Sequence, residues 1–365
     1  MKKLTAVFLF IMMTSAVIST ATSAAGSTPA APETEASAAA PAGDEQAADA
    51  ASALPVKVLL LPKFEIEKMY GDFPGEAQFY YEEYLAGADV YDVPNDAGSS
   101  GLYYKDGVAL YVLGMGKVNA ALGTMAVLSD SRFDFSDAYI ISTGCAGSAV
   151  GTTVMGDVFI VSAAVDFDLG HHADAREIAD PDGTTWFHDP DYDDSSVIFL
   201  NQDLTDKVYS LVKDVPVETT ETTRNYMKAA FDGARWAVRD PQVLRGTTAS
   251  GDNYWKGIYD HENAVLMAET YQCPDPYALT EMEDVAAARA VERMGLLDRM
   301  IIIRDSVNMD VFMQGAAPEN LWGDAEAEDL VDEESIEAAD IFKTAMKNNF
   351  EVGRVVIDKI LDGSF

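Results

Sequence analysis

Short apolar runs alternate with glycine turns and amphipathic stretches along most of this chain. Patterns typical of buried strands begin at Val56 (VKVLLL) and recur at Val108 to Leu113, Ala138 to Ser142, Val154 to Ser162, Arg245 to Ser250 and Met300 to Ile303. Several of these runs end in a tight glycine turn that leads into a helical pattern. This rhythm predicts an α/β fold, a three-layer αβα sandwich with a central mixed, mainly parallel sheet.

Helical patterns separate the predicted strands. They cover Gly75 to Ala86, Lys117 to Leu128, two amphipathic helices within Asp203 to Ala234, and a final helix within Glu333 to Leu361. No internal repeat interrupts the pattern after Val56, so we expect one folded domain.

The stretch from Tyr277 to Asp310 concentrates polar residues around one helix and one strand. It reads as a loop, then a helix that Thr280 caps with Glu283 at capping-box spacing, and Gly295 is placed to end that helix. The apolar run Met300 to Ile303 follows, and its β-branched residues predict a strand that is covered on both faces.

Polar residues come directly after this strand, namely Arg304, Asp305, Ser306 and Asn308. In open α/β sheets, ligands bind beyond the carboxyl ends of the strands. We therefore expect the functional site at this edge of the sheet.

The N-terminus has the pattern of a bacterial export signal. Residues 1–25 contain two lysines, an apolar core from Leu4 to Ile18 and small residues near a cleavage point. Residues 26–54 are rich in Ala, Pro and Glu and predict a disordered linker, so residues 55–365 form the expected domain. These patterns predict a periplasmic or secreted protein with no integral membrane span after signal removal.

The charge of the chain limits its partners. The 365 residues include 25 basic and 61 acidic side chains, a formal net charge of −36 at pH 7. Such a surface repels nucleic acid and anionic lipid and favours a neutral or cationic ligand, although a salty habitat explains the same imbalance. The two cysteines, Cys145 and Cys273, permit a disulfide without establishing one.

Two loops follow predicted strands and invite a chemical interpretation. Gly114 to Gly116 lacks the third glycine of a dinucleotide fingerprint and the Lys-Ser/Thr pair of a P-loop, so we expect a tight turn and no nucleotide cofactor. The loop Thr143 to Ser148 offers backbone N–H groups to an oxygen or anion. Cys145 within it has no evident histidine partner, which favours a small residue in a crowded loop over a nucleophile.

The acidic stretch Asp180 to Asp194 includes His188 but lacks the full spacing of a calcium loop. We expect a solvated loop and no metal ligands there, and keep a calcium-dependent surface protein as a third hypothesis. Glu67, after the first strand, would by itself be a surface carboxylate, and Glu283 a capping residue. Their combination with glycine turns and the polar strand end predicts one shared pocket.

The motifs resemble those of the nucleoside phosphorylase superfamily, which includes purine nucleoside phosphorylases and methylthioadenosine/adenosylhomocysteine nucleosidases. The matching segments are GMGKVNAA from Gly114, TGCAG from Thr143, GDV from Gly156, SGD from Ser250, EME from Glu281 and IRDS from Ile303. They occur in the family's order and span nearly all of Val56 to Val311. The exported, acidic form most resembles the purine nucleoside permease (NUP) family.

This resemblance implies a nucleoside phosphorylase-like fold and a site for a purine nucleoside. It implies that Glu283 accepts hydrogen bonds from the ribose hydroxyls, with Met282 against the sugar. Tyr254 would stack on the purine, with Trp255 beside it. Glu67 would activate water. The resemblance also places the following residues around the nucleophile and substrate: Arg304, Cys145, Ala146 and Gly116.

Asn308 stands where the nucleosidases carry an aspartate that protonates the departing base. An amide cannot deliver a proton, but it can donate to one purine atom and accept from another, which favours inosine or guanosine. The arginines expected around phosphate are not apparent beyond Arg304, with Lys63 as a further candidate. The chain is therefore expected to hydrolyse the N-glycosidic bond, with phosphate as a possible co-substrate and no other cofactor.

Two further expectations accompany this interpretation. The departures at Cys145 and Asn308 support a rival hypothesis, in which the protein binds a nucleoside without cleaving it and assists uptake. The resemblance also implies a homo-oligomer, because relatives form dimers, trimers or hexamers.

Overall fold

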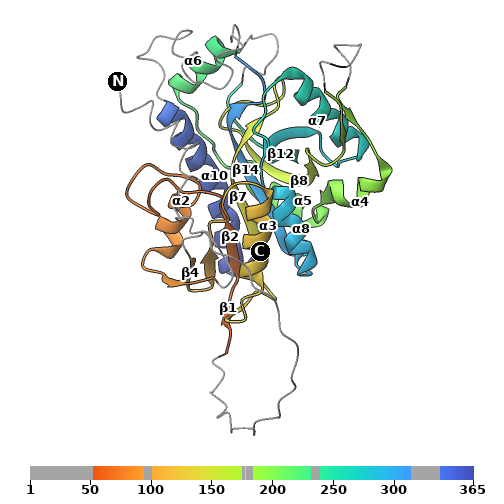
Figure 1. The fold of residues 1–365 in the computed structure, drawn as a ribbon. Coiled ribbons are helices and arrows are strands. Elements are labelled where there is room, and N and C mark those ends of the chain that lie inside the picture. The colour runs from red at the N-terminus through yellow and green to blue at the C-terminus, as the bar shows by residue number, and fades with distance from the viewer. Residues whose placement is uncertain (1–51, 94–100, 175–176, 178–183, 232–238, 314–337) are drawn as a thin grey trace, which may run out of the picture. The chain divides into compact units, whose positions relative to one another are not determined.

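The computed structural model describes residues 52–93, 101–174, 177, 184–231, 239–313 and 338–365 (Figure 1). Leu54 to Phe365 forms one compact unit. The predicted signal peptide and most of the predicted linker lie outside the described residues. Within them, no helix is both long enough and apolar enough to cross a bilayer.

The strands are short at the edges of the main sheet and long in its centre. Their bounds are β1 Leu54–Pro55, β2 Val58–Leu61, β3 Asp89–Tyr91, β4 Leu102–Lys105, β5 Val108–Leu110, β6 Phe133–Asp134, β7 Tyr139–Ser148, β8 Val158–Asp166, β9 His171–His172, β10 Trp186–Phe187, β11 Val197–Phe199, β12 Val243–Ser250, β13 Tyr277–Glu281 and β14 Met300–Met309.

The helices range from single turns to one long C-terminal helix. Their bounds are α2 Gln78–Tyr80, which continues as the π-helix η1 Tyr81–Leu85, α3 Lys117–Leu128, η3 Pro190–Tyr192, α4 Asp193–Ser196, α5 Gln202–Val212, α6 Glu221–Ala230, α7 Ile258–Thr270, α8 Asp284–Arg293, η4 Leu297–Arg299 and α10 Ala338–Leu361.

The main sheet is mixed and closes on itself in part. Its order is β11-β8-β12-β13-β7-β2-β5-β4-β3, and β14 pairs with both β7 and β8. The strand pairs β7–β14, β14–β8, β8–β12, β12–β13 and β13–β7 therefore form a ring. The pairs β2–β5, β2–β7, β12–β8, β12–β13 and β14–β7 are parallel. The pairs β13–β7 and β14–β8 within the ring are antiparallel, as are β11–β8, β3–β4 and β4–β5 toward the edges.

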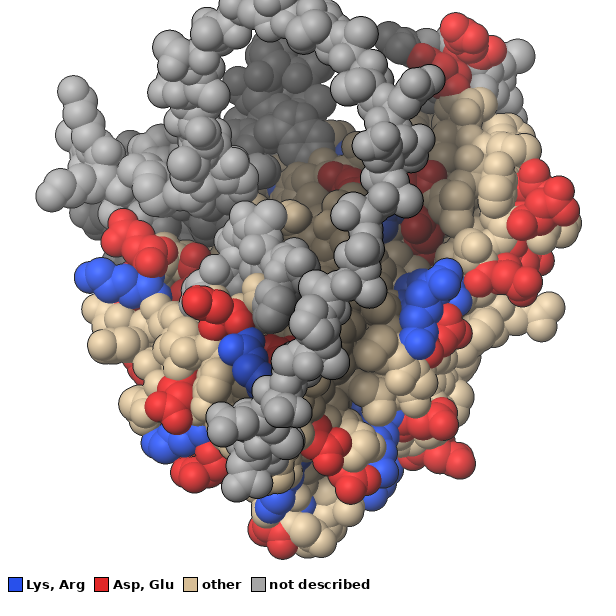
Figure 2. All heavy atoms as spheres, turned by 60° about the horizontal axis from the view of Figure 1, so that its bottom comes forward, with Lys and Arg blue, Asp and Glu red and all other residues tan. Residues whose placement is uncertain are grey.

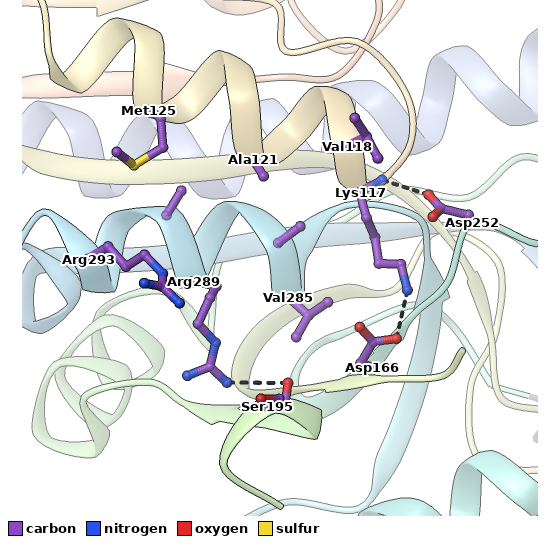
Figure 3. A pocket seen from close by; sticks show the side chains of 12 residues that line it. Lys117, Val118, Ala121, Met125, Asp166, Ser195, Asp252, Val285, Arg289 and Arg293 are labelled. Carbon is purple, nitrogen blue, oxygen red and sulfur yellow. Dashed lines mark hydrogen bonds and ion pairs between the residues drawn. The ribbon is translucent and has the colours of Figure 1, made fainter. Parts of the chain in front are cut away.

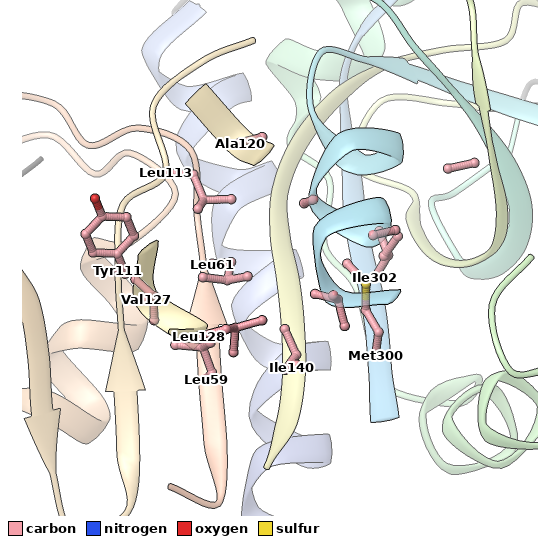
Figure 4. Close-up of a cluster of buried hydrophobic side chains, with 14 of the residues drawn as sticks. Leu59, Leu61, Tyr111, Leu113, Ala120, Val127, Leu128, Ile140, Met300 and Ile302 are labelled. Carbon is pink, nitrogen blue, oxygen red and sulfur yellow. The ribbon is translucent and has the colours of Figure 1, made fainter. Parts of the chain in front are cut away.

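Alternating side chains on the central strands divide the core into two halves. Leu59, Ile140 and Ile302 pack on one face with residues of α3 and α8 (Figure 4). Leu60 and Ile303 pack on the other face with residues of α10, α5 and α2. Helices thus cover both faces of the sheet (Figure 1). The predicted three-layer α/β class with a mixed central sheet is confirmed.

The hydrophobic pattern of the sequence predicted most of the central helices and strands correctly. The helix predicted from Lys117 to Leu128 has those bounds, and Met300 to Ile303 is buried throughout. The two amphipathic helices are α5 and α6, and the described part of the last helix is α10.

The prediction for Tyr277 to Glu281 is wrong, because these residues form the strand β13 and not a loop. The YALTE segment has too few apolar residues to show the pattern of a buried strand, although four of its five residues are buried.

Strand β14 contains one irregularity that bears on the site. Its pairing with β7 shifts between Ser306 and Asn308, so that Val307 is an extra residue opposite the step from Ala146 to Gly147. Such a bulge bends a strand and changes the direction in which later side chains point.

Candidate functional site

Arg304 is the centre of a buried network of charged side chains. Its Nε donates to Asp284 Oδ2 at 2.8 Å, and its Nη2 donates to Asp284 Oδ1 at 2.9 Å. Nη2 also donates to Glu281 Oε2 and Glu283 Oε2, both at 3.1 Å. Nη1 donates to the carbonyl oxygen of Cys145 at 2.8 Å. A guanidinium with its donors shared in this way has a fixed orientation.

Glu76 lies beside this guanidinium, at the start of the segment that leads into α2. Its Oε1 is 3.9 Å from Arg304 Nη1 and accepts the backbone N–H of Cys145 at 2.8 Å. Its Oε2 accepts the backbone N–H of Lys63 at 2.7 Å. Gly144 makes this approach possible: it has φ +150°, and a Cβ at that position would overlap the Glu76 carboxylate. The main chain just after β2 and within β7 therefore holds Glu76.

Lys63 is the second buried cation of the network. Its Nζ donates to Ser142 Oγ at 2.6 Å and to the Thr143 carbonyl oxygen at 3.0 Å, and lies 3.4 Å from Asp284 Oδ1. Although burial opposes ionisation, Arg304 and Lys63 hold the pKa of Asp284 well below its ordinary value. Asp284 therefore keeps a negative charge that joins the two cations.

The start of α8 is stabilised differently from the predicted capping box. Thr280 lies in β13, and the helix begins at Asp284 with no side-chain cap from its N-cap residue Glu283. Instead, Glu281 Oε2 accepts the backbone N–H groups of Glu283 at 2.6 Å and Asp284 at 2.7 Å. The capping prediction is wrong because the chain is still extended at Thr280. The prediction that Gly295 ends the helix is confirmed, since α8 ends at Arg293 and Gly295 has φ +73°.

Glu283 and Glu281 both contact Arg304, but their other hydrogen-bond partners differ. Glu283 Oε1 accepts the backbone N–H of Gly116 at 3.0 Å, so the glycine turn holds this carboxylate beside Arg304. Burial, and then the nearby charge of Asp284, raise the pKa of Glu281 to about 7, while Arg304 opposes the shift. Glu281 also accepts hydrogen bonds from the hydroxyls of Ser250 and Thr248. It is a structural acid that ties β12 and β13 to α8.

A small cavity of about 20 Å³ lies next to this network. Its lining residues are Gly147, Asn253, Tyr254, Trp255, Thr280, Glu281, Met282, Asn308 and Asp310. The Asn308 amide donates to the Tyr254 hydroxyl at 2.5 Å. Trp255 is buried and stacks on Phe167 with ring centres 4.8 Å apart. A cavity of this size holds about one water molecule, so a ring system enters only when Tyr254 moves. Tyr254 is 42% exposed, which leaves it room to do so.

The structure brings most of the predicted site residues together. Arg304, Glu283, Cys145 and Gly116 share hydrogen bonds within one network, and Met282, Tyr254, Trp255 and Asn308 line the adjoining cavity. Ala146 is buried in β7 directly after Cys145.

Glu67 is not part of this arrangement. It is exposed, with φ +54°, on the segment between β2 and α2, and the carboxylate next to Arg304 is Glu76. The family resemblance placed the base at Glu67, the carboxylate that follows the first predicted strand. In the structure residues 64–75 form a loop, and the carboxylate that reaches Arg304 comes after this loop. The Gly75-Glu76 pair at the start of the aromatic helical segment was the available signal.

Cys145 is a free thiol, as is Cys273. Burial, followed by the charges of Glu76 and Asp305, raises the pKa of the Cys145 thiol well above its ordinary value. A thiol in this state is a poor nucleophile, which supports the interpretation of Cys145 as a small residue in a crowded loop.

A wider surface groove of about 410 Å³ lies between α3 and α8 (Figure 3). Lys117 at its end forms ion pairs with Asp166 at 2.7 Å and Asp168 at 2.9 Å, and its backbone N–H donates to Asp252 Oδ1. These contacts tie the glycine turn to the loops after β8 and β12. Arg289 lies along the groove and donates to the carbonyl oxygen of Val197.

The acidic stretch predicted around His188 is described from Thr184 onward. His188 Nε2 lies 2.6 Å from Asp193 Oδ1, and His171 pairs with Asp189 at 3.4 Å. In the described part of the chain, no group of three or more His, Cys, Asp or Glu side chains is arranged to hold a metal ion.

The curled mixed sheet, the glycine turn bonded to a carboxylate of the next motif, and the polar strand ends beside an aromatic cavity define a nucleoside phosphorylase-like protein. Solved structures with this fold include a 5′-methylthioadenosine/S-adenosylhomocysteine nucleosidase mutant from Helicobacter pylori with 5′-methylthioadenosine in its active site (TM-score 0.52, 14% identity, 83% of this chain and 99% of that one). Another is the futalosine hydrolase of the same organism (TM-score 0.51, 15% identity, 83% and 98%).

A family model described as purine nucleoside permease (NUP) matches residues 55–364, and the chain belongs to this family. A probable purine nucleoside permease of Schizosaccharomyces pombe is 29% identical over 221 residues, which cover 54% of this chain and 63% of the fission yeast protein. A 5′-methylthioadenosine/S-adenosylhomocysteine nucleosidase of Bacillus pumilus is 26% identical over 228 residues, covering 60% and 79%. The family predicted from the motifs is confirmed.

Proposed function

We propose that this protein binds a purine nucleoside and hydrolyses its N-glycosidic bond. The observation that carries the proposal is the meeting of Glu76, Arg304 and Glu283 beside the cavity that Asn308 and Tyr254 line. Such a hydrolysis needs a carboxylate that can accept a proton, a cation in a fixed position and an acceptor for the sugar hydroxyls.

The substrate roles follow the family resemblance. Glu283 accepts hydrogen bonds from the ribose hydroxyls, and Met282 packs against the sugar. Tyr254 swings away from Asn308 to admit the purine and then stacks on it, with Trp255 as a fixed wall. Asn308, released from Tyr254, forms hydrogen bonds with the base and stabilises the charge that develops on it. The backbone around Cys145, Ala146 and Gly116 lines the side where water enters.

Glu76 is the proposed general base, in place of Glu67. Its two oxygens each accept a backbone N–H group, and Oε1 faces Arg304, so the carboxylate is held in a fixed position. Water attacks C1′, its proton passes to Glu76, and the bond to the purine nitrogen breaks with its electron pair left on the base. The departing purine takes a proton from solvent, since Asn308 has none to give.

The surroundings of Glu76 favour water over phosphate as the nucleophile. The backbone N–H groups of Lys63 and Cys145, which could hold an anion, already donate to Glu76. The two cations, Lys63 and Arg304, are paired with Asp284. A phosphate ion would therefore lie against carboxylates without a free cation among the described site residues, and this repulsion supports hydrolysis without a co-substrate.

The alternative function is binding without cleavage, in support of nucleoside uptake. The closed cavity and the amide at Asn308 favour this candidate, because a carrier needs a gated pocket and no proton donor for the base. The two candidates differ in whether free base appears.

We also propose that the protein is exported and forms a homo-oligomer. The pattern of residues 1–25 supports export to the periplasm or medium. Val118 and Leu122, which are 65% and 66% exposed on α3 beside the groove, support self-association through that helix. Sedimentation equilibrium tests the second point, and a monomer at micromolar concentration would contradict it.

The decisive experiment incubates the purified protein with inosine, guanosine or adenosine, with and without phosphate, and measures free base by chromatography. Free base without phosphate is the expected result, with inosine or guanosine preferred. A strict need for phosphate indicates a phosphorylase, and bound but intact nucleoside indicates the carrier.

The matched variants Glu76→Gln and Glu67→Gln test the proposed base. Glu76→Gln should lower kcat by about 10²–10⁴-fold, the usual contribution of a general base, with nucleoside affinity little changed. Glu67→Gln should leave kcat as it is, because Glu67 is exposed. The opposite ranking would return the role to Glu67.

A further inference from the structure

Glu65 binds the loop that carries Glu76 through four backbone donors. Its Oε1 accepts the N–H groups of Ile66, at 2.8 Å, and of Gly75. Its Oε2 accepts those of Ala77 at 2.9 Å and Gln78 at 2.6 Å. One carboxylate thus fixes the main chain at the start of the loop and on both sides of Glu76.

The remaining contacts of this loop leave Glu76 little freedom. Its own backbone N–H donates to the Phe64 carbonyl oxygen at 3.2 Å, which closes residues 64–76 into a loop. Because Gly75 and Ala77 are both bonded to Glu65, the peptide units on either side of Glu76 cannot rotate independently. The direction in which the Glu76 side chain leaves the backbone is therefore set by Glu65.

Gly75 allows this close approach. A Cβ at position 75 would lie 2.7 Å from Glu65 Oε1 and 2.8 Å from Glu65 Cα, closer than real Cβ contacts. The glycine and the carboxylate are two parts of one arrangement. Burial raises the pKa of Glu65 to about 7, while its four backbone donors oppose that shift. Burying this carboxyl group is unfavourable, and the four hydrogen bonds that it accepts from the backbone offset that cost.

We propose that Glu65 is a positioning residue for the base Glu76, because its carboxylate holds the main chain on both sides of Glu76 at the far end of the loop formed by residues 64–75. The inference rests on the proposed function, because it assigns to Glu65 an effect on turnover that passes through Glu76. Nothing in the geometry gives Glu65 a contact of its own with substrate.

A double-mutant cycle tests this inference. The variants are Glu65→Ala, Glu76→Gln and the two combined, with kcat and KM measured for inosine. Glu65→Ala should lower kcat by about 10–100-fold, since a displacement near 1 Å can cost about 10²-fold, and should change KM by less than about twofold. In the Glu76→Gln background the same substitution should cost no further activity, because the base that it positions is already lost.

Three further variants make the result specific. Glu65→Gln keeps one acceptor oxygen and should recover part of the lost kcat, and it replaces Glu65→Ala in the cycle if that variant fails to fold. Gly75→Ala should lower kcat in the same way, and no further in the Glu76→Gln background. Glu83→Ala removes an exposed glutamate from η1 and should change nothing.

The outcomes separate the inference from the function on which it rests. Multiplicative losses in the Glu65→Ala/Glu76→Gln protein, unchanged kcat in Glu65→Ala, or a rise in KM at constant kcat would overturn the role of Glu65 while the unsubstituted protein still releases base. If the unsubstituted protein releases no base, the proposed function falls and the inference falls with it.

Discussion

Asp305 follows Arg304 in the chain, yet its side chain has a very different environment. Arg304 is surrounded by carboxylates, whereas Asp305 lies fully buried among Tyr80, Asn349 and Glu76. Burial, and then the charge of Glu76, raise the pKa of Asp305 well above its ordinary value. Asp305 is therefore harder to ionise in the folded protein than in the unfolded chain.

This difference predicts a pH dependence of stability. Asp305 contributes stability that is fully present below the unfolded pKa, near 4, and is lost as pH rises through the higher folded pKa. As pH rises above the unfolded pKa of Asp305, the free energy of unfolding should fall by up to about 1.4 kcal/mol per pH unit more in the unsubstituted protein than in Asp305→Asn, the effect of one proton.

Urea denaturation at several pH values measures this slope. The exposed Asp89→Asn on β3 is the control and should follow the unsubstituted protein. Parallel curves for Asp305→Asn and the unsubstituted protein would show that Asp305 is ionised in the fold.

The sequence predicted individual site residues from their distance along the chain to the end of a predicted strand. This succeeded for Arg304 and Glu283, because both lie within a few residues of a well-patterned element. It failed for the carboxylate beside Arg304, because the length of a loop does not reveal where its far end returns. Asp284 was missed, and Lys63 was considered only as a phosphate ligand, since their pairing depends on contacts between segments far apart in the chain.

The elements of the fold depend on close approaches that propensity alone does not predict. Gly353 lies within α10, and a Cβ there would overlap the hydroxyl of Tyr80, the last residue of α2. Tyr80 is buried and donates to Asn349 Oδ1 at 2.7 Å, so it cannot move aside easily. The glycine thus sets the distance between α10 and the segment that carries Glu76.

Gly353→Ala should therefore destabilise the protein by up to about 2 kcal/mol. Alanine improves helix propensity by about 1 kcal/mol, but overpacking in a filled core costs about 1–3 kcal/mol, and the second effect dominates here. Thermal or urea denaturation gives the value.

The Tyr80→Phe background supplies the control, because it removes the atom that a Cβ would overlap. There Gly353→Ala should be neutral or stabilising. An equal loss in both backgrounds would place the strain elsewhere.

Strand and helix periodicity identified the elements with long apolar patterns and missed those without them. The edge strands β3 and β11 have three residues each, and β13 has too few apolar residues for a clear pattern. The ring of strands could not be inferred either, since it depends on β14 pairing with β8 as well as with β7.

The whole molecule carries far more acid than base. Its formal net charge is −36, and acidic side chains are spread over the face shown in Figure 2 with basic ones among them. Mutual repulsion of these charges opposes the compact state, and salt weakens it, since the Debye length falls from about 30 Å at 0.01 M to about 10 Å at 0.1 M.

Raising sodium chloride from about 0.01 M to about 0.3 M should therefore raise Tm by a few degrees, the size of shift that about 1 kcal/mol produces in domains of 150–250 residues. Calorimetry or circular dichroism measures the shift. Glucose at equal osmolarity is the control, because it does not screen charge. A Tm that falls with salt would mean that attractive ion pairs dominate the surface.

The extra residue at Val307 has one more consequence. Beyond this point β14 pairs with β7 in a shifted register, and this shift, not the apolar run before it, decides that Asn308 lies opposite Gly147 and lines the cavity. Under the proposed function, replacing Asn308 with another polar residue would change which bases are accepted and leave the pairing of β14 with β7 as it is.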